Sequence, residues 1–377
     1  MKKILVTQPY LPPLEEVEPY LKKIWENKWL TNKGPFHQEL EEKLAEYLGV
    51  KHVALFSNGT LALLIALKAL GIKGEVITTP YTFVATAHSL LWNNLTPVFA
   101  DVDPVCGNLD PKSVENVITD KTEAILPVHV YGNPCDVSGL QKIADKYRLK
   151  LIYDAAHAFG VEINNKSIMQ YGDLSVMSFH ATKLFNTFEG GAIACHTDEM
   201  KDKIDHLKNF GFDGETTIIG TGINAKMNEF SAVMGLLQLN HFEDILLKRQ
   251  TIAERYRKNL EGITGIRFMC EMAGVQHNNA YFPVFVEDAY RLNRDALYQI
   301  LKEHNIYGRR YFYPLISWLD SYRDFPSSKA SNLPVAEKLA KQVICLPVYP
   351  DLELKIVDSI CSIIASLSYG LQVTDYM

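Results

Sequence analysis

Between about residues 37 and 240, stretches with a helical pattern alternate with short apolar runs. The helical stretches include residues 38–48 and 61–70. Strands separated by helices require crossover connections, so this alternation predicts an α/β fold with a mostly parallel sheet covered on both faces. Seven apolar runs are the expected strands: Val53–Phe56, Val76–Thr79, Pro97–Ala100, Ala124–Val128, Leu151–Tyr153, Leu174–Phe179 and Ala192–Cys195.

The pattern changes after about residue 245. The later elements are a long charged helix, an apolar segment and two further helices, expected over 245–260, 281–286, 291–304 and 352–367. We therefore expect a large domain over residues 1–245 and a smaller C-terminal α/β domain over residues 246–377, with the boundary inside one continuous helix. Residues 1–35 are expected to form an N-terminal arm that packs on a partner or on the small domain.

Composition narrows the class of protein. The chain has 377 residues, 47% of them hydrophobic and 22% charged, and this suits a globular protein with more than one core. The net charge of −6 does not favour nucleic acid as a partner. No apolar run approaches the ~20 residues that cross a bilayer, so we expect no membrane partner and a cytoplasmic location. The six cysteines are scattered without a Cys-x-x-Cys pair, so neither a metal site nor a disulfide framework is expected.

Two charged residues follow neighbouring expected strands. Asp154 ends the apolar run 149–154, and Lys183 comes shortly after the run 174–179. Ligands of parallel sheets bind outside the carboxyl ends of the strands. A lysine and an aspartate held there can serve pyridoxal 5'-phosphate (PLP), the lysine by forming a Schiff base and the aspartate by pairing with the protonated pyridine nitrogen. The alternative for the lysine alone is a solvated surface residue.

Further candidate groups lie at the ends of the same strands. Gly59 and Thr60 open a helix whose free N–H groups and dipole favour a phosphate, although the segment also suits a plain N-cap. Phe83 can stack on a flat ring or pack in the core. His157 can contact the hydroxyl of the PLP ring or be a satisfied core histidine, and Ser178 can add a phosphate contact. The chain contains neither Gly-x-Gly-x-x-Gly nor Gly-x-x-x-x-Gly-Lys-Ser/Thr, which argues against a dinucleotide fold and an NTPase.

The order of these motifs resembles one known family. The sequence contains Asn-Gly-Thr, Pro-Tyr-Thr-Phe-Val-Ala-Thr, Leu-Pro-Val-His-Val-Tyr-Gly, Asp-Ala-Ala-His-Ala-Phe-Gly, Ser-Phe-His-Ala-Thr-Lys and Glu-Gly-Gly, in that order. This set resembles the DegT/DnrJ/EryC1/StrS family of PLP-dependent aminotransferases that act on nucleotide-linked keto sugars. The resemblance runs from about Trp29 to Pro350. It implies PLP fold type I, like that of aspartate aminotransferase.

The resemblance also implies roles for individual residues. Lys183 would hold the cofactor and move the proton, and Asp154 would pair with the pyridine nitrogen. Asn224 would reach the phosphate of the other subunit's cofactor, which implies an obligate homodimer with shared active sites. The family often has arginine where this chain has Lys226, which leaves the role of Lys226 open because lysine cannot form a bidentate fork. His157 would contact the ring hydroxyl, and Phe83 would stack on the ring. The phosphate would be held by Gly59, Thr60 and Ser178.

The N-terminal segments resemble a narrower group within the family. Residues 6–13 and 28–35 look like those of enzymes that aminate dTDP-4-keto-6-deoxy-D-glucose at C4, with L-glutamate as the amino donor. The implied product is dTDP-4-amino-4,6-dideoxy-D-glucose for O-antigen assembly. Some relatives carry histidine in place of the lysine and are dehydratases, and Lys183 places this chain with the aminotransferases. A 3-keto or UDP-linked sugar, or a non-catalytic regulator with this fold, remains the alternative.

Contacts to the sugar nucleotide are the least determined part of the site. Diphosphates attract arginine and lysine, but any one such residue is also explained as a solvated surface charge. The candidates are Lys33, Arg309, Arg310, Tyr311 and Tyr349.

Overall fold

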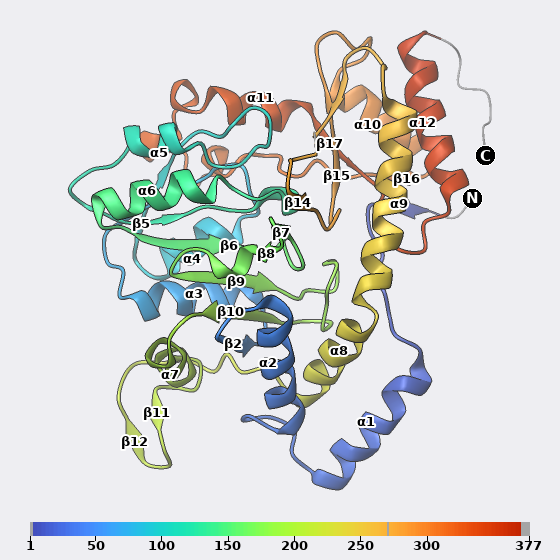
Figure 1. Cartoon of the computed structure of the whole chain (residues 1–377). Helices are drawn as coiled ribbons and strands as arrows, with labels where there is room; N and C mark the ends of the chain where they lie inside the picture. Colours follow the sequence, from blue (N-terminus) through green and yellow to red (C-terminus); the bar gives the residue numbers. More distant parts are fainter. Residues whose placement is uncertain (1–2, 270, 371–377) are drawn as a thin grey trace.

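The computed structural model describes residues 3–269 and 271–370, and its centre is a seven-stranded sheet (Figure 1). Strand β10 is antiparallel to both its neighbours, β2 and β9, and the other pairs in the sheet are parallel. The predicted mostly parallel sheet is therefore confirmed, with every predicted strand present and each boundary within two residues. In spatial order the strands are β2 (His52–Phe56), β10 (Gly191–Cys195), β9 (Leu174–Ser178), β6 (Lys150–Asp154), β5 (Thr122–Leu126), β3 (Glu75–Thr78) and β4 (Thr96–Phe99).

Helices cover both faces of this sheet because its strands are apolar on both sides. In β2, Val53 and Leu55 belong to one core, whereas Ala54 and Phe56 point into another. The first core is shared with α2 (Pro35–Leu48) and α8 (Glu229–Asn240), and the second with α3 (Gly59–Leu70) and α7 (Asp198–Leu207). The other helices of this region are α4 (Ala85–Trp92), α5 (Pro111–Asn116) and α6 (Val137–Tyr147).

A second antiparallel sheet belongs to the C-terminal region. Its order is β13 (Ile266–Phe268), β15 (Phe282–Val286), β17 (Val343–Leu346). Helices α10 (Arg294–Glu303) and α12 (Leu354–Ser368) share its core, while α11 (Pro334–Gln342) packs against β15. The predicted apolar segment and the two predicted helices therefore correspond to β15, α10 and α12.

One long helix joins the two regions. Helix α9 (Phe242–Leu260) places Phe242 and Ile245 in the core of the large sheet, and Ile252, Tyr256 and Leu260 in the core of the second sheet. The expected domain boundary at 245/246 falls inside this continuous helix. A rigid helix that contributes to two cores fixes the position of one region against the other.

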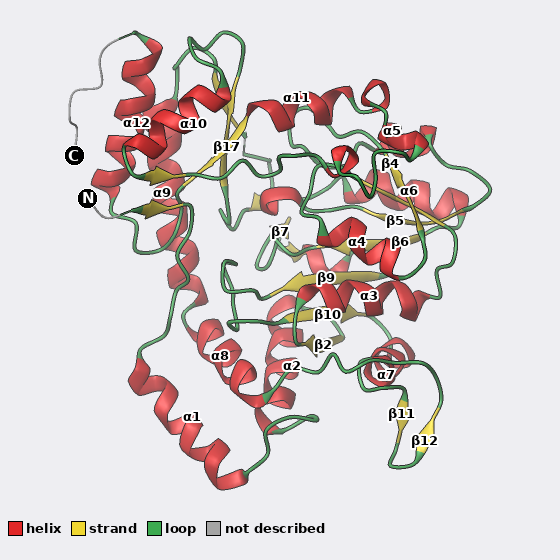
Figure 2. Ribbon diagram, turned by 180° about the vertical axis from the view of Figure 1, so that it is seen from behind, coloured by secondary structure: helices red, strands yellow, loops and turns green. Residues whose placement is uncertain are grey.

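The N-terminal arm also contacts both regions. Strand β1 (Ile4–Leu5) pairs in parallel with β16 (Ile306–Tyr307), and α1 (Leu14–Asn27) packs against α8. Short strands complete the fold: β7 (Glu162–Ile163), β8 (Lys166–Ser167) and β14 (Val275–Gln276) form one sheet, and β11 (Phe212–Asp213) and β12 (Thr217–Ile218) form a hairpin that projects beyond α7 (Figure 2).

The described ranges contain neither a membrane-spanning helix nor a metal-binding cluster. None of the helices there is both long and apolar enough to cross a bilayer. Within the same ranges, no group of three or more His, Cys, Asp or Glu side chains is arranged to hold a metal ion. Of the six cysteines, Cys270 lies outside the described residues.

A buried carboxylate ties α8 to the start of α2. The Glu229 side chain is 2% exposed and accepts hydrogen bonds from the backbone N–H groups of Phe36 and His37, at 3.0 and 2.8 Å. These N–H groups lie in the first turn of α2, where they have no acceptor within the helix and where the dipole favours a negative charge. The contact therefore stabilises a helix and the packing of two helices at once.

We predict that Glu229→Ala lowers the free energy of unfolding by about 2 kcal/mol, because two buried donors lose a charged acceptor. Thermal and urea unfolding of the purified variant measure this loss. Glu254→Ala, which removes an exposed glutamate on α9, is the control and should change stability by no more than about 0.5 kcal/mol. Equal losses in the two variants would contradict the role given to Glu229.

Candidate active site

A cavity of about 290 Å³ opens at the carboxyl ends of the central strands. The ends of β6 and β9, the start of α3, and the loop between β9 and β10 all contribute to its lining. Eight residues singled out from the sequence lie together on its wall, although they are spread over most of the chain: Gly59, Thr60, Phe83, Asp154, His157, Ser178, Lys183 and Tyr311.

The part of the cavity expected to bind the phosphate is the junction of α3 and β9. Asn58 caps α3 by accepting a hydrogen bond from the Leu61 N–H. The N–H groups of Gly59 and Thr60 lie in the first turn, where a helix offers them no acceptor. Ser178 lies directly against Gly59: a Cβ at position 59 would come within 2.9 Å of the Ser178 Cβ. Only glycine permits this approach. The result is a cradle of free N–H groups and hydroxyls that suits a phosphate.

Asp154 is held in place by the chain around it. Its carboxylate accepts hydrogen bonds from the Thr86 hydroxyl at 2.8 Å and from the Ala156 N–H at 3.1 Å. The residue is 4% exposed, and this burial raises the pKa of the carboxyl group above its ordinary value, against the effect of the two hydrogen bonds. A protonated ring nitrogen beside this buried carboxylate would supply the positive charge that it needs.

Lys183 projects from the loop that follows β9. Its backbone N–H bonds to the carbonyl of His180, and its Nζ lies 3.4 Å from the hydroxyl of Tyr281. Burial lowers the pKa of the Lys183 amine from 10.5 to about 8, and the charge of Asp154 opposes this shift. The free amine is therefore a usable base near neutral pH.

The remaining lining fits the flat ring of PLP. Nδ1 of His157 is buried and has no hydrogen-bond partner, so the cavity contains a polar atom that a ring hydroxyl would satisfy. Burial also lowers the pKa of His157 well below its ordinary value, so this imidazole is neutral. Phe83 is 57% exposed although it lines the cavity, which leaves its aromatic surface free for stacking. The donor set, the orphaned nitrogen and the free aromatic surface together match the expected cofactor.

Among the lining residues that were not predicted from the sequence, three contact predicted ones. Thr86 bonds Asp154, Tyr281 contacts Lys183, and the ring of Phe312 stacks on His157 with centroids 5.5 Å apart. Thr86 stands within the segment that also holds Phe83, and this could have identified it. Tyr281 and Phe312 come from the C-terminal region, and no local pattern links them to the residues of the large sheet.

Four predicted residues do not line this cavity. The side chain of Asn224 is exposed, and its backbone forms a bridge with Asn209. Lys33 pairs with Asp205 at 2.8 Å, Arg309 is exposed beside Cys345, and Tyr349 is buried in the core of the small region. Arg310, also considered, pairs with Asp295 at 2.8 Å. The contact of Asn224 with the other subunit's cofactor, and the sugar-nucleotide contacts of the other residues, thus stay predictions.

Comparison with known proteins gives a consistent result. The model of the DegT/DnrJ/EryC1/StrS aminotransferase family matches residues 14–365. A dTDP-4-amino-4,6-dideoxy-D-glucose transaminase of Shigella dysenteriae is 53% identical over 366 residues, covering 97% of this chain and 99% of its own. An enzyme of the same name from Escherichia coli is 50% identical, covering 96% of this chain and 98% of its own.

A solved structure extends the similarity to three dimensions. The structure of DesI in the presence of its TDP-sugar product superposes with a TM-score of 0.93 at 35% identity, covering 98% of this chain and 94% of that one. Aminotransferases of the matching family depend on PLP, the cofactor that the cavity residues fit. The ordered motifs, the cavity and the family match over residues 14–365 agree, and the chain belongs to the DegT/DnrJ/EryC1/StrS aminotransferase family.

Proposed function

We propose that this chain transfers the amino group of L-glutamate to C4 of dTDP-4-keto-6-deoxy-D-glucose, giving dTDP-4-amino-4,6-dideoxy-D-glucose for polysaccharide assembly. The observation that carries the chemistry is the placement of Lys183 and Asp154 on the wall of one cavity beside a phosphate cradle. The choice of sugar is supported by the 53% identity to an enzyme of that name over nearly the whole chain.

The residues that would hold PLP divide into three sets. The N–H groups at the start of α3, together with the hydroxyls of Thr60 and Ser178, would bind the phosphate. Phe83 would stack on the ring, and His157 would contact its hydroxyl. Asp154 would stay ionised and pair with the ring nitrogen. When bound, PLP supplies an electron sink that stabilises the charge left when a proton leaves the amino-acid Cα.

Lys183 would move the proton in both half-reactions. Its lowered pKa of about 8 means that about half of the free amine is neutral at pH 8 and can accept a proton from Cα of glutamate. In the second half-reaction the same amine, in its protonated form, can deliver a proton to C4 of the sugar. Because Lys183 lies on one side of the cavity, the face from which it delivers this proton determines the configuration at C4.

The test of the function uses purified protein with PLP, L-glutamate and dTDP-4-keto-6-deoxy-D-glucose, with the product followed by NMR. We expect a 4-amino sugar with an equatorial amine. An axial amine would confirm transamination at C4 but would reject the proposed product. Absence of amination by an enzyme that still holds its cofactor would reject this sugar, and 3-keto and UDP-linked sugars would be tested next.

We predict that Lys183→Ala reduces transamination by at least about a hundredfold, because the group that moves the proton is lost. The second readout is the site of attachment: borohydride reduction of the wild-type enzyme should fix the cofactor on the peptide that contains Lys183, as measured by mass spectrometry. Lys203→Ala, which removes an exposed lysine on α7, is the control and should keep both properties. Wild-type turnover by Lys183→Ala would reject the assignment.

We further propose that the active unit is a homodimer with shared sites. Asn224 does not line the cavity of its own chain, which leaves its side chain available to a second copy. An exposed apolar patch is formed by Leu30, Phe188 and Phe230. The rings of Phe188 and Phe230 stack with centroids 5.6 Å apart, and the Leu30 carbonyl accepts a hydrogen bond from the neighbouring Glu229 N–H. Covering this patch with a second copy would remove apolar surface from water.

Subunit mixing tests whether the sites are shared. Lys183→Ala and Asn224→Asp should each be inactive alone. In co-expressed random hybrids one site of each mixed dimer contains both native residues, so activity should recover to about one quarter of the wild-type value. If each subunit formed its whole site, the mixture would show only the average of the two parents. A monomer in sedimentation experiments would also reject the proposal.

A further inference from the structure

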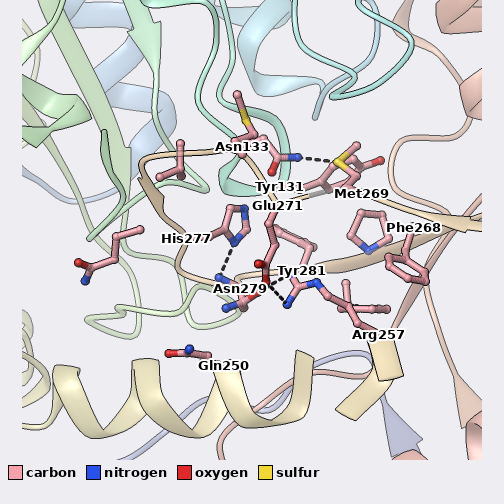
Figure 3. A pocket seen from close by; sticks show the side chains of 15 residues that line it. Tyr131, Asn133, Gln250, Arg257, Phe268, Met269, Glu271, His277, Asn279 and Tyr281 are labelled. Atoms are coloured by element: carbon pink, nitrogen blue, oxygen red, sulfur yellow. Dashed lines mark hydrogen bonds and ion pairs between the residues drawn. The ribbon is translucent and has the colours of Figure 1, made fainter. Parts of the chain in front are cut away.

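Tyr281 separates two cavities. It lines the cavity that contains Lys183, and it also lines a neighbouring pocket of about 240 Å³ between α9 and the second sheet. Figure 3 shows this second pocket, with Tyr281 on its wall among Tyr131, His277, Asn279 and Arg257. The tyrosine side chain is therefore a partition between the amine and the space behind it.

The tyrosine is the polar neighbour of the Lys183 amine on the side of the small region. The Nζ atom is 3.4 Å from the phenolic oxygen and 5.9 Å from the centroid of the ring. The ring is fixed by three aromatic neighbours in edge-to-face contact: His157 at 5.0 Å, Tyr311 at 5.7 Å and Tyr131 at 5.9 Å. This packing holds the hydroxyl at one place in the cavity.

The backbone before Tyr281 is braced from two directions. Arg249 of α9 is 2% exposed and donates hydrogen bonds to the carbonyls of Asn279 and Ala280, at 3.3 and 3.2 Å. Asn278 donates to the carbonyls of His157 and Phe159, which belong to the loop after β6. In the described part of the chain Arg249 forms no ion pair. Its buried guanidinium group donates instead to two backbone carbonyls just before Tyr281, and these hydrogen bonds hold that segment in place.

We propose that Tyr281 is a positioning residue for Lys183: its ring keeps water from the amine, and its hydroxyl holds Nζ in both protonation states. This inference rests on the proposed role of Lys183 in proton transfer. A phenol accepts a hydrogen bond from an ammonium group and donates one to a neutral amine, whereas an ionised carboxylate can only accept. Burial raises the pKa of Tyr281, so its hydroxyl stays protonated where the enzyme works.

Other titratable groups face the same cavity and bear on how the amine titrates. Asp154 favours the charged form of the amine, whereas His157 is neutral and places no charge beside it. His180, Glu189 and Tyr311 also line the cavity. In the described part of the chain none of them forms a hydrogen bond or ion pair with Nζ, so Tyr281 is the neighbour whose removal most directly changes both the hydration and the orientation of the amine.

The first experiment measures the pKa of Lys183 in the apoprotein. The rate at which an acylating reagent labels Lys183 is followed against pH by mass spectrometry, in the wild type, Tyr281→Ala and Tyr281→Phe. Tyr281→Ala should admit water and raise the pKa by at least about one unit toward 10.5, because desolvation is what lowers it. Tyr281→Phe keeps the ring and should show no such rise. An unchanged pKa in Tyr281→Ala would overturn the role of the ring.

The second experiment measures what the Tyr281 hydroxyl contributes to turnover. Tyr281→Phe should lower kcat roughly tenfold and leave the KM for both substrates within about twofold, because the lost hydrogen bond orients the group that moves the proton. Tyr256→Phe is the control: that tyrosine is fully buried, packs on Phe282 and lies in the core of the small region. A kcat of Tyr281→Phe equal to that of the control would overturn the role of the hydroxyl.

The two proposals fail in different ways. If the cofactor attached to a lysine other than Lys183, the proposed function would fail whatever the labelling showed. If it attached to Lys183 and the two Tyr281 variants behaved like Tyr256→Phe, only the role of Tyr281 would be rejected.

Discussion

The buried carboxylate of Asp154 is the constraint on which the rest of the site depends. A charge at the end of a central strand is costly unless its partners are in place. Thr86 and the Ala156 N–H supply two of them, and the residue still has a raised pKa because water is excluded. The cavity around it is therefore built for a cationic partner. A protonated ring nitrogen satisfies that requirement, which links the electrostatics of this fold to the cofactor of the family.

Lys183 shows the complementary effect of burial in the same cavity. Burial disfavours the charged form of the Lys183 amine. It therefore lowers the pKa of this amine to about 8 and makes it a base. The carboxylate limits the shift, so the two residues adjust one another. The small region completes this environment, since Tyr281 closes the cavity on one side and the brace from Arg249 and Asn278 keeps it there.

The long helix α9 explains how two separate cores build one site. Its first turn packs in the core of the large sheet, while its second half packs against β15 and α12. A helix cannot bend freely between two cores, so the segment at 278–281 arrives at Lys183 in a fixed position. The N-terminal arm reinforces this arrangement through the pairing of β1 with β16.

The sequence by itself determined the central sheet and most of the candidate cofactor site. Seven short apolar runs between helical stretches predict parallel strands, and polar residues that follow such strands must meet at one edge. This is why the sequence predicts that Asp154 and Lys183 lie together, and why Gly59 and Ser178 are predicted to share one phosphate. Each of those residues sits at a fixed offset from a strand, so local pattern is enough to place it.

Only the tertiary structure decided which residues of the small region reach the site. Tyr281 and Phe312 lie far along the chain from Lys183, in segments whose own pattern predicts no more than a strand or a loop. Their contacts depend on the angle between the two sheets. This angle is set by the packing of α9 in both cores. The same packing places Tyr349 in a core and Lys33 in an ion pair with Asp205, because burial and pairing depend on neighbours that are remote in sequence.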